Sequence, residues 1–179
     1  MIRAFDFLFS LMGLIILSPL LILVWIIVYF TNGSPLFKQH RVGYKQRIFL
    51  ILKFRTMPIY TKSVATHLLS QNRITPFGNF LRRTKVDEIP QLYNVLIGDM
   101  SLVGPRPCLI NQKELISERN KRGIFNMKPG ITGLAQISGI NMETPKILAE
   151  TDLKMIKKMN LFYYFYYIFK TILTILRKP

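Results

Sequence analysis

The acidic pair Asp87-Glu88 is the group of residues in this chain best suited to chemistry. The sequence holds only nine acidic residues against 25 lysines and arginines, yet Arg82, Arg83 and Lys85 stand immediately before this pair. A phosphoryl-transfer site needs an anionic nucleophile or metal ligand inside a field that still attracts phosphate. The pattern therefore favours chemistry on a phosphorylated substrate. In the alternative interpretation, the two acids only cap the helix that follows them.

The overall composition points to an anionic partner and to the membrane. The 179 residues carry a formal net charge of +16, and half of them are hydrophobic. Such a charge attracts nucleic acid, anionic lipid or a phosphorylated small molecule. Cys108 is the only cysteine, which excludes an intramolecular disulfide and a site of several thiolates. His40 and His67 are isolated from each other, so carboxylates and cations must supply any catalysis.

The first third of the chain contains a membrane segment. No charged residue occurs between Phe7 and Phe37, and the apolar run from Leu11 to Phe30 is long enough to cross a bilayer. Ser18-Pro19 falls in its middle, where proline removes a backbone bond and the serine hydroxyl can bond a carbonyl one turn back. The segment is either a kinked spanning helix, which the residues alone favour, or a re-entrant hairpin of two half-helices. The heavier cluster of cations follows the segment and places the remainder on the cytoplasmic side: Lys38, Arg41, Lys45 and Arg47.

The remainder predicts an α+β fold. Residues 34–57 alternate as two short strands joined at Gly43, with Lys53 and Arg55 on the face opposite the apolar residues. Residues 58–72 are polar and predict a loop. A short helix is expected over 75–83 with Pro76 in its first turn, and a second helix is expected to start near Asp87.

Three further segments are expected after that second helix. Residues 111–121 predict a charged, solvated helix. Residues 127–136 are loop-like, and their Lys128, glycines and hydroxyl could cradle a phosphate. Residues 159–176 are rich in tyrosine and phenylalanine, which favours a helix lying on the membrane surface over a second spanning helix. A helix buried in the core is disfavoured because its phenols would need partners.

Seven motifs, taken in order, resemble one family. They are Ser18-Pro19, Lys53-Phe54-Arg55-Thr56-Met57, Leu81-Arg82-Arg83-Thr84, Asp87-Glu88-Ile89-Pro90-Gln91-Leu92, Asn94 to Ser101, Gly104-Pro105-Arg106-Pro107 and Pro129-Gly130-Ile131-Thr132-Gly133. Over nearly its whole length the chain resembles a bacterial sugar transferase of the monotopic phosphoglycosyl transferase superfamily, in its minimal, catalytic-domain-only form.

The resemblance implies a membrane enzyme of glycoconjugate assembly. It implies transfer of a sugar 1-phosphate from a UDP-sugar to polyprenyl phosphate with release of UMP, at the cytoplasmic face of the bacterial inner membrane. It also implies a re-entrant hairpin, which reverses the preference for a spanning helix. Residues 1–33 would form that hairpin, and residues 34–179 the catalytic part of one integrated domain. Membrane lipids and a second copy of the chain in a homodimer are the other candidate partners, and no nucleic acid is expected.

The resemblance assigns roles to individual residues. Asp87 carries over as the nucleophile and Glu88 as its partner in metal or proton handling, with Mg²⁺ as cofactor. Asp152 falls where the family carries an acid, and it is a candidate ligand for the metal or the nucleotide, or else a solvated carboxylate. The cations of the motifs are candidate ligands of the substrate phosphates or nucleotide: Lys53, Arg55, Arg82, Arg106 and Lys128.

Arg106, between two prolines, suits a pre-positioned bidentate phosphate clamp, unless it is an incidental arginine on a surface turn. The chain departs from the family pattern at Lys128 and Ile140, where arginine is usual, and this bears on sugar or nucleotide selectivity. A different class of function is a membrane-tethered protein that binds polyanions or lipid without catalysis, but it leaves Asp87-Glu88 without a purpose.

Overall fold

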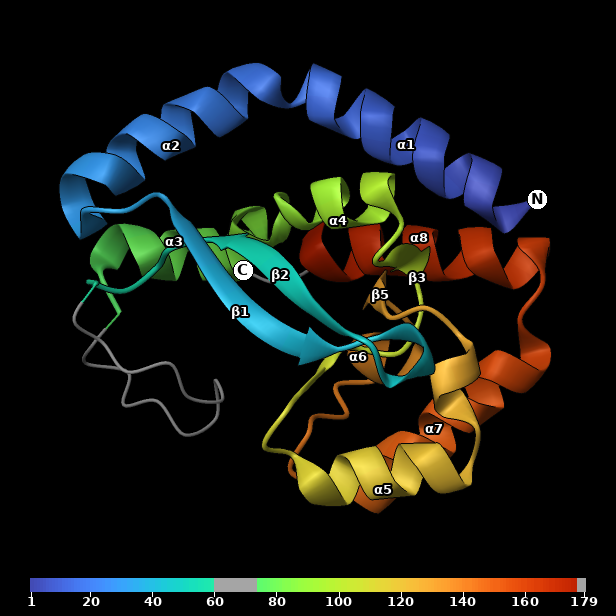
Figure 1. Cartoon of the computed structure of the whole chain (residues 1–179). Helices are drawn as coiled ribbons and strands as arrows, with labels where there is room; N and C mark the ends of the chain where they lie inside the picture. The colour runs from blue at the N-terminus through green and yellow to red at the C-terminus, as the bar shows by residue number, and fades with distance from the viewer. Residues whose placement is uncertain (60–73, 177–179) are drawn as a thin grey trace.

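A computed structural model describes residues 1–59 and 74–176 of the chain (Figure 1). It combines helices with two small sheets, which confirms the predicted α+β class. Most of the loop predicted over 58–72, together with His67, lies outside the described residues.

The N-terminal apolar segment forms two helices, α1 (Ile2–Ile16) and α2 (Ser18–Asn32). They meet at Leu17 with a bend of 63°. As expected, the Ser18 hydroxyl donates to the Ile15 carbonyl at 2.8 Å, one turn back. The bent pair arches over α4 (Gln91–Ile97) and α8 (Leu161–Leu176) (Figure 1).

The bend leaves the topology of this segment as a prediction. Among the described residues no single helix is long and apolar enough to cross a bilayer, whereas α1 and α2 together reach the required length and composition. The break therefore lies where Ser18-Pro19 predicts it, and the re-entrant hairpin stays an expectation.

The predicted hairpin is present as β1 (Leu36–Val42) and β2 (Ile48–Phe54), joined by the 3-10 turn η1 (Tyr44–Gln46). The strands are antiparallel, with Leu36 opposite Phe54 and Val42 opposite Ile48. The short strand β4 (Cys108–Leu109) pairs with the other edge of β1. The sheet thereby brings the segment just after Arg106 beside the end of β1.

The helix α3 (Pro76–Thr84) confirms the expected short helix, and the Thr75 hydroxyl caps it by accepting from the Gly78 amide at 3.0 Å. The second helix does not start near Asp87, because α4 begins at Gln91. Asp87 and Glu88 instead lie in the 3-10 turn η4 (Val86–Glu88). Pro90 has no N–H for the carbonyl four residues back, so the Val86 carbonyl accepts from Ile89 instead.

Residues 127–136 are more regular than predicted. They contain the strand β5 (Gly130–Thr132), which pairs in parallel with β3 (Ser101–Val103), and most of the short helix α6 (Leu134–Ile137). The pairing brings Gly130 so close to Gly104 that a Cβ on Gly130 would lie 2.0 Å from the Gly104 nitrogen. The glycines thus serve a close backbone contact.

Two helices lie on the side of the molecule away from α1 and α2 (Figure 1). The predicted charged helix is α5 (Lys113–Lys121), followed by the 3-10 turn η5 (Ile124–Asn126). It packs on α7 (Pro145–Lys158). The side chains between them include buried Leu115 and Leu148.

The C-terminal helix α8 has two different faces. Phe162 and Phe169 are exposed, as a surface helix requires, whereas Tyr164 and Tyr167 are buried. The argument from unpartnered phenols is therefore wrong for this face, because the Tyr164 hydroxyl donates to Asp6 of α1 at 2.9 Å. Asp6 is buried and also accepts from the Ser101 hydroxyl and the Leu102 amide.

Candidate active site

Asp87 is a buried carboxylate with incomplete hydrogen bonding. The residue is 8% exposed, and its Oδ1 atom is buried without a hydrogen-bond partner. Burial, and then the neighbouring charge of Glu88, raise the pKa of Asp87 to about 6, although Lys53, Lys85 and Arg82 oppose the shift. A carboxylate in this setting is weakly stabilised as an anion, which is a property of reactive groups.

Glu88 is held in the opposite state. Its Oε1 accepts from Lys53 Nζ at 2.7 Å and from Arg106 Nη2 at 2.9 Å. Burial alone would raise the pKa of Glu88, but Lys53 and Arg106 hold this pKa well below its usual value. The adjacent acids therefore have divergent environments, the pattern that separates acid–base or nucleophilic roles.

The alternative that the pair only caps a helix finds no support in these contacts. The N-cap residue of α4 is Pro90, and no side chain caps that helix or η4. Capping therefore does not account for the two acids.

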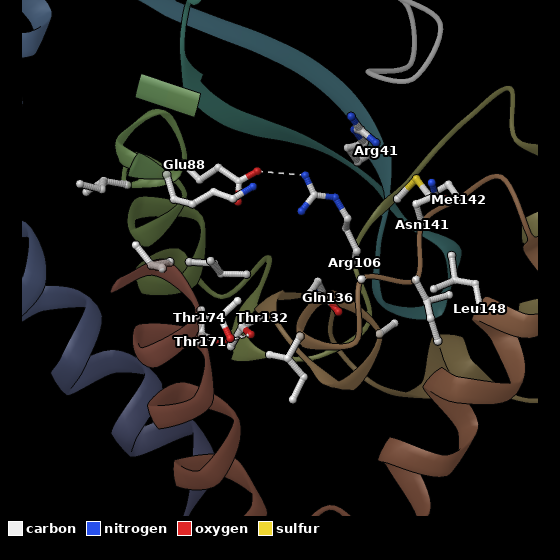
Figure 2. A pocket seen from close by; sticks show the side chains of 18 of the residues that line it. Arg41, Glu88, Arg106, Thr132, Gln136, Asn141, Met142, Leu148, Thr171 and Thr174 are labelled. Carbon is white, nitrogen blue, oxygen red and sulfur yellow. Dashed lines mark hydrogen bonds and ion pairs between the residues drawn. The ribbon is translucent and has the colours of Figure 1, made fainter. Parts of the chain in front are cut away.

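The turn Gly104-Pro105-Arg106-Pro107 is held at each carbonyl. These four carbonyls accept, in chain order, from Gln136 Nε2 at 3.2 Å, Gly130 N at 2.9 Å, Arg119 Nη1 at 2.7 Å and Arg41 Nη1 at 3.1 Å. The guanidinium of Arg106 extends to Glu88 across a cavity (Figure 2). The alternative of an incidental arginine on a surface turn is hard to reconcile with so many contacts.

The cavity has a volume of about 590 Å³ and has a charged part and an apolar part. Arg41, Arg83, Lys85, Glu88 and Arg106 line the charged part. The apolar lining includes Ile140, Met142 and Leu148, and Thr171 and Thr174 of α8 belong to another wall (Figure 2). Asp87 itself is not in the lining, although its neighbour Glu88 is.

The five predicted phosphate ligands fall into two groups. Lys53 and Arg106 join Glu88 directly, and Arg82 is close enough to Asp87 to lower its pKa while its Nε donates to the Thr56 hydroxyl at 2.8 Å. Of the five, Arg106 is the one in the lining of this cavity. The other two ligands, Arg55 and Lys128, have different neighbours. Arg55 donates to the Ser34 and Leu36 carbonyls at the start of β1. Lys128 lies near Gly98 at the end of α4, beside Arg3.

Asp152 is neither solvated nor grouped with the acidic pair. It is fully buried, and its Oδ2 accepts from Nε and Nη2 of Arg119 at 3.0 and 2.7 Å. Among the described residues no three His, Cys, Asp or Glu side chains are grouped so as to hold a metal ion. The role of Asp152 as a ligand of the metal or the nucleotide stays a prediction, whereas the alternative that Asp152 is a solvated carboxylate is wrong.

Sequence reasoning missed several cavity residues. The sequence indicates Arg41 only as one of the cations that follow the membrane segment, and it indicates no role for Gln136. Alternation along β1 offers a signal for Arg41, because it shares a strand face with Gln39 while the intervening His40 is exposed. For Gln136 no local signal exists, since its position depends on the pairing of β3 with β5.

Comparisons with known proteins agree on one family. A family model described as bacterial sugar transferase matches residues 1–178. The undecaprenyl-phosphate galactose phosphotransferase of Salmonella typhimurium is 36% identical over 98% of this chain and 40% of its own length. The UDP-galactose-lipid carrier transferase of Erwinia amylovora is 35% identical with the same coverage. Exopolysaccharide production protein ExoY of Rhizobium meliloti is 35% identical over 95% of this chain and 83% of its own length.

Proposed function

The chain belongs to the bacterial sugar transferase family, and we propose that it transfers a sugar 1-phosphate from a UDP-sugar to polyprenyl phosphate, releasing UMP. The activities for which the Salmonella and Erwinia relatives are named support this reaction class. The chain spans about 40% of the length of those two relatives, so their activity comes to it as part of this proposal. The observation that carries the proposal is the divergent Asp87-Glu88 pair beside a cavity with a cationic part.

The proposed reaction has two displacements at one phosphorus atom. An Asp87 carboxylate oxygen attacks the sugar-bearing phosphorus of the donor, and the bond from that phosphorus to the bridging oxygen breaks, so UMP leaves with that oxygen. An oxygen of polyprenyl phosphate then attacks the phosphorus of the aspartyl intermediate and releases the Asp87 carboxylate. Splitting the transfer in this way replaces one difficult step with two easier ones. The buried carboxylate must turn toward the cavity when the donor binds.

The cations of the cavity suit the binding of a diphosphate. Glu88 fixes Lys53 and Arg106 by charge-assisted hydrogen bonds, which orients the planar Arg106 group for phosphate oxygens. Arg41 and Lys85 line the cavity together with Arg106 and add positive charge there. Together they offset the repulsion between an anionic donor and an anionic nucleophile.

The residues present also fit a magnesium ion. Asp87 Oδ1 is an unpartnered buried oxygen, and Mg²⁺ is commonly held by one or two carboxylates together with substrate phosphates. Asp87 and Glu88 would hold the ion. When bound, it supplies positive charge that neutralises the donor phosphates.

The membrane assignment is part of the same proposal. Exposed apolar side chains lie on α1, α2 and α8, among them Ile16, Phe30 and Phe162. We place α1 and α2 in the cytoplasmic leaflet of the inner membrane as a re-entrant hairpin, with α8 lying at its surface. The cavity would then lie where a water-soluble donor and a lipid-borne acceptor can meet.

The decisive experiment follows the donor phosphate. Purified full-length protein in lipid nanodiscs is given a panel of UDP-sugars labelled with ³²P in the sugar-bearing phosphate, with Mg²⁺. UMP release and acid-stable label on the polypeptide are measured before acceptor is added. Both should require Asp87 and should be lost in Asp87→Asn, and polyprenyl phosphate should discharge the label.

Two results would count against the proposal. Product that accumulates with no labelled polypeptide would remove the covalent intermediate. Salt-dependent binding of any polyanion, with no UMP release from any donor, would instead support the non-catalytic alternative.

A further inference from the structure

We propose that Arg119 and Asp152 are positioning residues that hold Arg106 in its phosphate-binding arrangement. The inference rests on the proposed function, in which Arg106 binds the donor phosphates. It assigns Asp152 a role through Arg119 and Arg106 rather than on a metal ion.

The three residues form a continuous chain of contacts from α7 to the cavity. Asp152 of α7 binds two nitrogens of Arg119 through its Oδ2 atom, and the third nitrogen of Arg119 donates to the Arg106 carbonyl at 2.7 Å. Arg119 is 2% exposed and Asp152 is 0% exposed. Each of the three guanidinium nitrogens of Arg119 therefore makes a contact within the protein, and burial separates this group from the solvent that carries substrate.

The contact to the Arg106 carbonyl matters because it acts on the peptide that sets the direction of the side chain. Arg106 precedes Pro107, which restricts its backbone to extended conformations. With its carbonyl fixed by Arg119, the side chain leaves the turn toward Glu88 (Figure 2). Within the described part of the chain, Nε and Nη1 of Arg106 have no hydrogen-bond partner, so they can donate to phosphate oxygens.

The buried pair is not an efficient way to gain stability. Removing two charges from water carries a large desolvation penalty, and apolar side chains of similar volume often stabilise a protein equally well. In addition, Asp152 Oδ1 is buried without a partner. A requirement for one fixed geometry at Arg106 accounts for an ion pair at this position better than stability does.

The first test is Arg119→Lys, compared with Arg122→Lys as a matched control. Arg122 also joins α5 to α7, through a 3.4 Å contact with Glu150, but at the surface and without touching Arg106. Lysine at 119 lacks the fork that reaches Asp152 and the carbonyl together. In UMP-release assays of the full chain, Arg119→Lys should lower kcat/KM for the UDP-sugar by about tenfold or more. KM for polyprenyl phosphate should not change, and Arg122→Lys should match wild type.

The second test separates positioning from folding. If Arg119 acts through Arg106, the double variant Arg106→Ala/Arg119→Lys should be no slower than Arg106→Ala alone. A loss that multiplies in the double variant would show that Arg119 acts elsewhere and would overturn the inference.

The third test replaces the pair by Arg119→Met/Asp152→Leu, which keeps volume without charge. The melting temperature should stay near that of wild type, while kcat/KM for the donor should stay low. Wild-type kinetics in this variant, or in Arg119→Lys, would overturn the inference and leave the proposed function intact. A wild-type protein that releases no UMP from any donor would overturn both.

Discussion

At the scale of single residues, the roles of Asp87 and Glu88 follow from their different partners. Glu88 has two cations within hydrogen-bond distance, whereas one oxygen of Asp87 has no partner. Glu88 is thereby a stable anion that organises Lys53 and Arg106. Burial and the charge of Glu88 disfavour the ionised form of Asp87. A covalent bond to phosphorus would remove this unfavourable charge. Glu88 is thus suited to a structural task and its neighbour Asp87 to a reactive one, although both are carboxylates.

The pKa of Asp87 predicts the acid limb of the pH profile. The nucleophile must be ionised, and its pKa of about 6 implies that the active fraction falls below that pH. We expect kcat/KM for the donor to drop about tenfold for each pH unit below 6 and to be level above about pH 7. UMP release measured between pH 5 and 8.5 tests this. A profile that stays level to pH 5 would contradict the assigned environment.

The same pKa predicts that the reactive residue destabilises the fold. A carboxyl whose folded-state pKa is raised binds more protons in the folded protein between about pH 3.8 and 6, so stability falls as pH rises through that window. Asp87→Asn should therefore raise the free energy of unfolding at pH 7.5 by about 3 kcal/mol, since the pKa rises from 3.8 to about 6. The gain should vanish below about pH 4.

Thermal unfolding at both pH values measures this gain. Glu114→Gln, at an exposed position of α5, is the control and should change little at either pH. An Asp87→Asn protein that is less stable than wild type at pH 7.5 would show that the carboxylate is favourably held.

At the scale of elements, α8 and α1 are joined through a buried polar contact. Oδ1 of Asp6 accepts from the Tyr164 hydroxyl, the Ser101 hydroxyl and the Leu102 amide. A carboxylate in an apolar helix is costly unless it is paired or well hydrogen-bonded. This contact therefore fixes the rotation of both helices and, with it, the wall of the cavity that α8 contributes.

Loss of the Tyr164 hydroxyl should weaken that junction. Tyr164→Phe removes one of three donors from a buried carboxylate, which should lower the free energy of unfolding by about 1 to 3 kcal/mol. Tyr166→Phe is the matched control, because Tyr166 is 38% exposed on the same helix. Equal melting temperatures of the two variants would contradict a structural role for the Asp6 contact.

The elements also show how far the sequence alone can be read. The hairpin, the short helix with Pro76 in its first turn and the break at Ser18 depend on neighbouring residues, and they were predicted correctly. The start of α4 was misplaced although its cause, Pro90, is visible in the sequence. Strand β5 and the Arg119–Asp152 pair depend on contacts between distant segments, and no local pattern marks such contacts.

The candidate site was also predicted only in part from the sequence. The motifs identified Glu88 together with Lys53 and Arg106, both of which contact it. They also included Arg55 and Lys128, whose charge suits phosphate but whose side chains lie elsewhere. A charge in a motif indicates what a residue can bind, whereas its place in the packed structure decides whether it reaches the ligand.

At the scale of the whole molecule, the apolar exterior and the charged cavity belong to different surfaces. Large apolar side chains are exposed on α1, α2 and α8, including Phe30 at 82% and Phe162 at 73%. Such exposure in one protein marks a surface that contacts lipid or another protein. Because α8 has exposed apolar residues and also lines the cavity, the two surfaces meet along that helix.

The re-entrant hairpin predicts that both ends of the arch face the same side of the bilayer. Single cysteines at Ala4 and Arg47, in a Cys108→Ala background, should both react with an impermeant maleimide from the cytoplasmic side only. Both positions are exposed in the structure, and Cys108 is buried. Labelling of the two positions from opposite sides would establish a spanning segment and exclude the hairpin.

The contact between Asp6 and Tyr164 also has a consequence during synthesis. The two residues are 158 positions apart in the chain. The ribosome therefore synthesises α1 long before it synthesises Tyr164, whose hydroxyl completes the hydrogen bonds of Asp6. Until then the nascent α1 holds an incompletely satisfied carboxyl group, which discourages it from settling deep in the lipid. Helix α8, translated long after α1, thus completes the anchoring of α1.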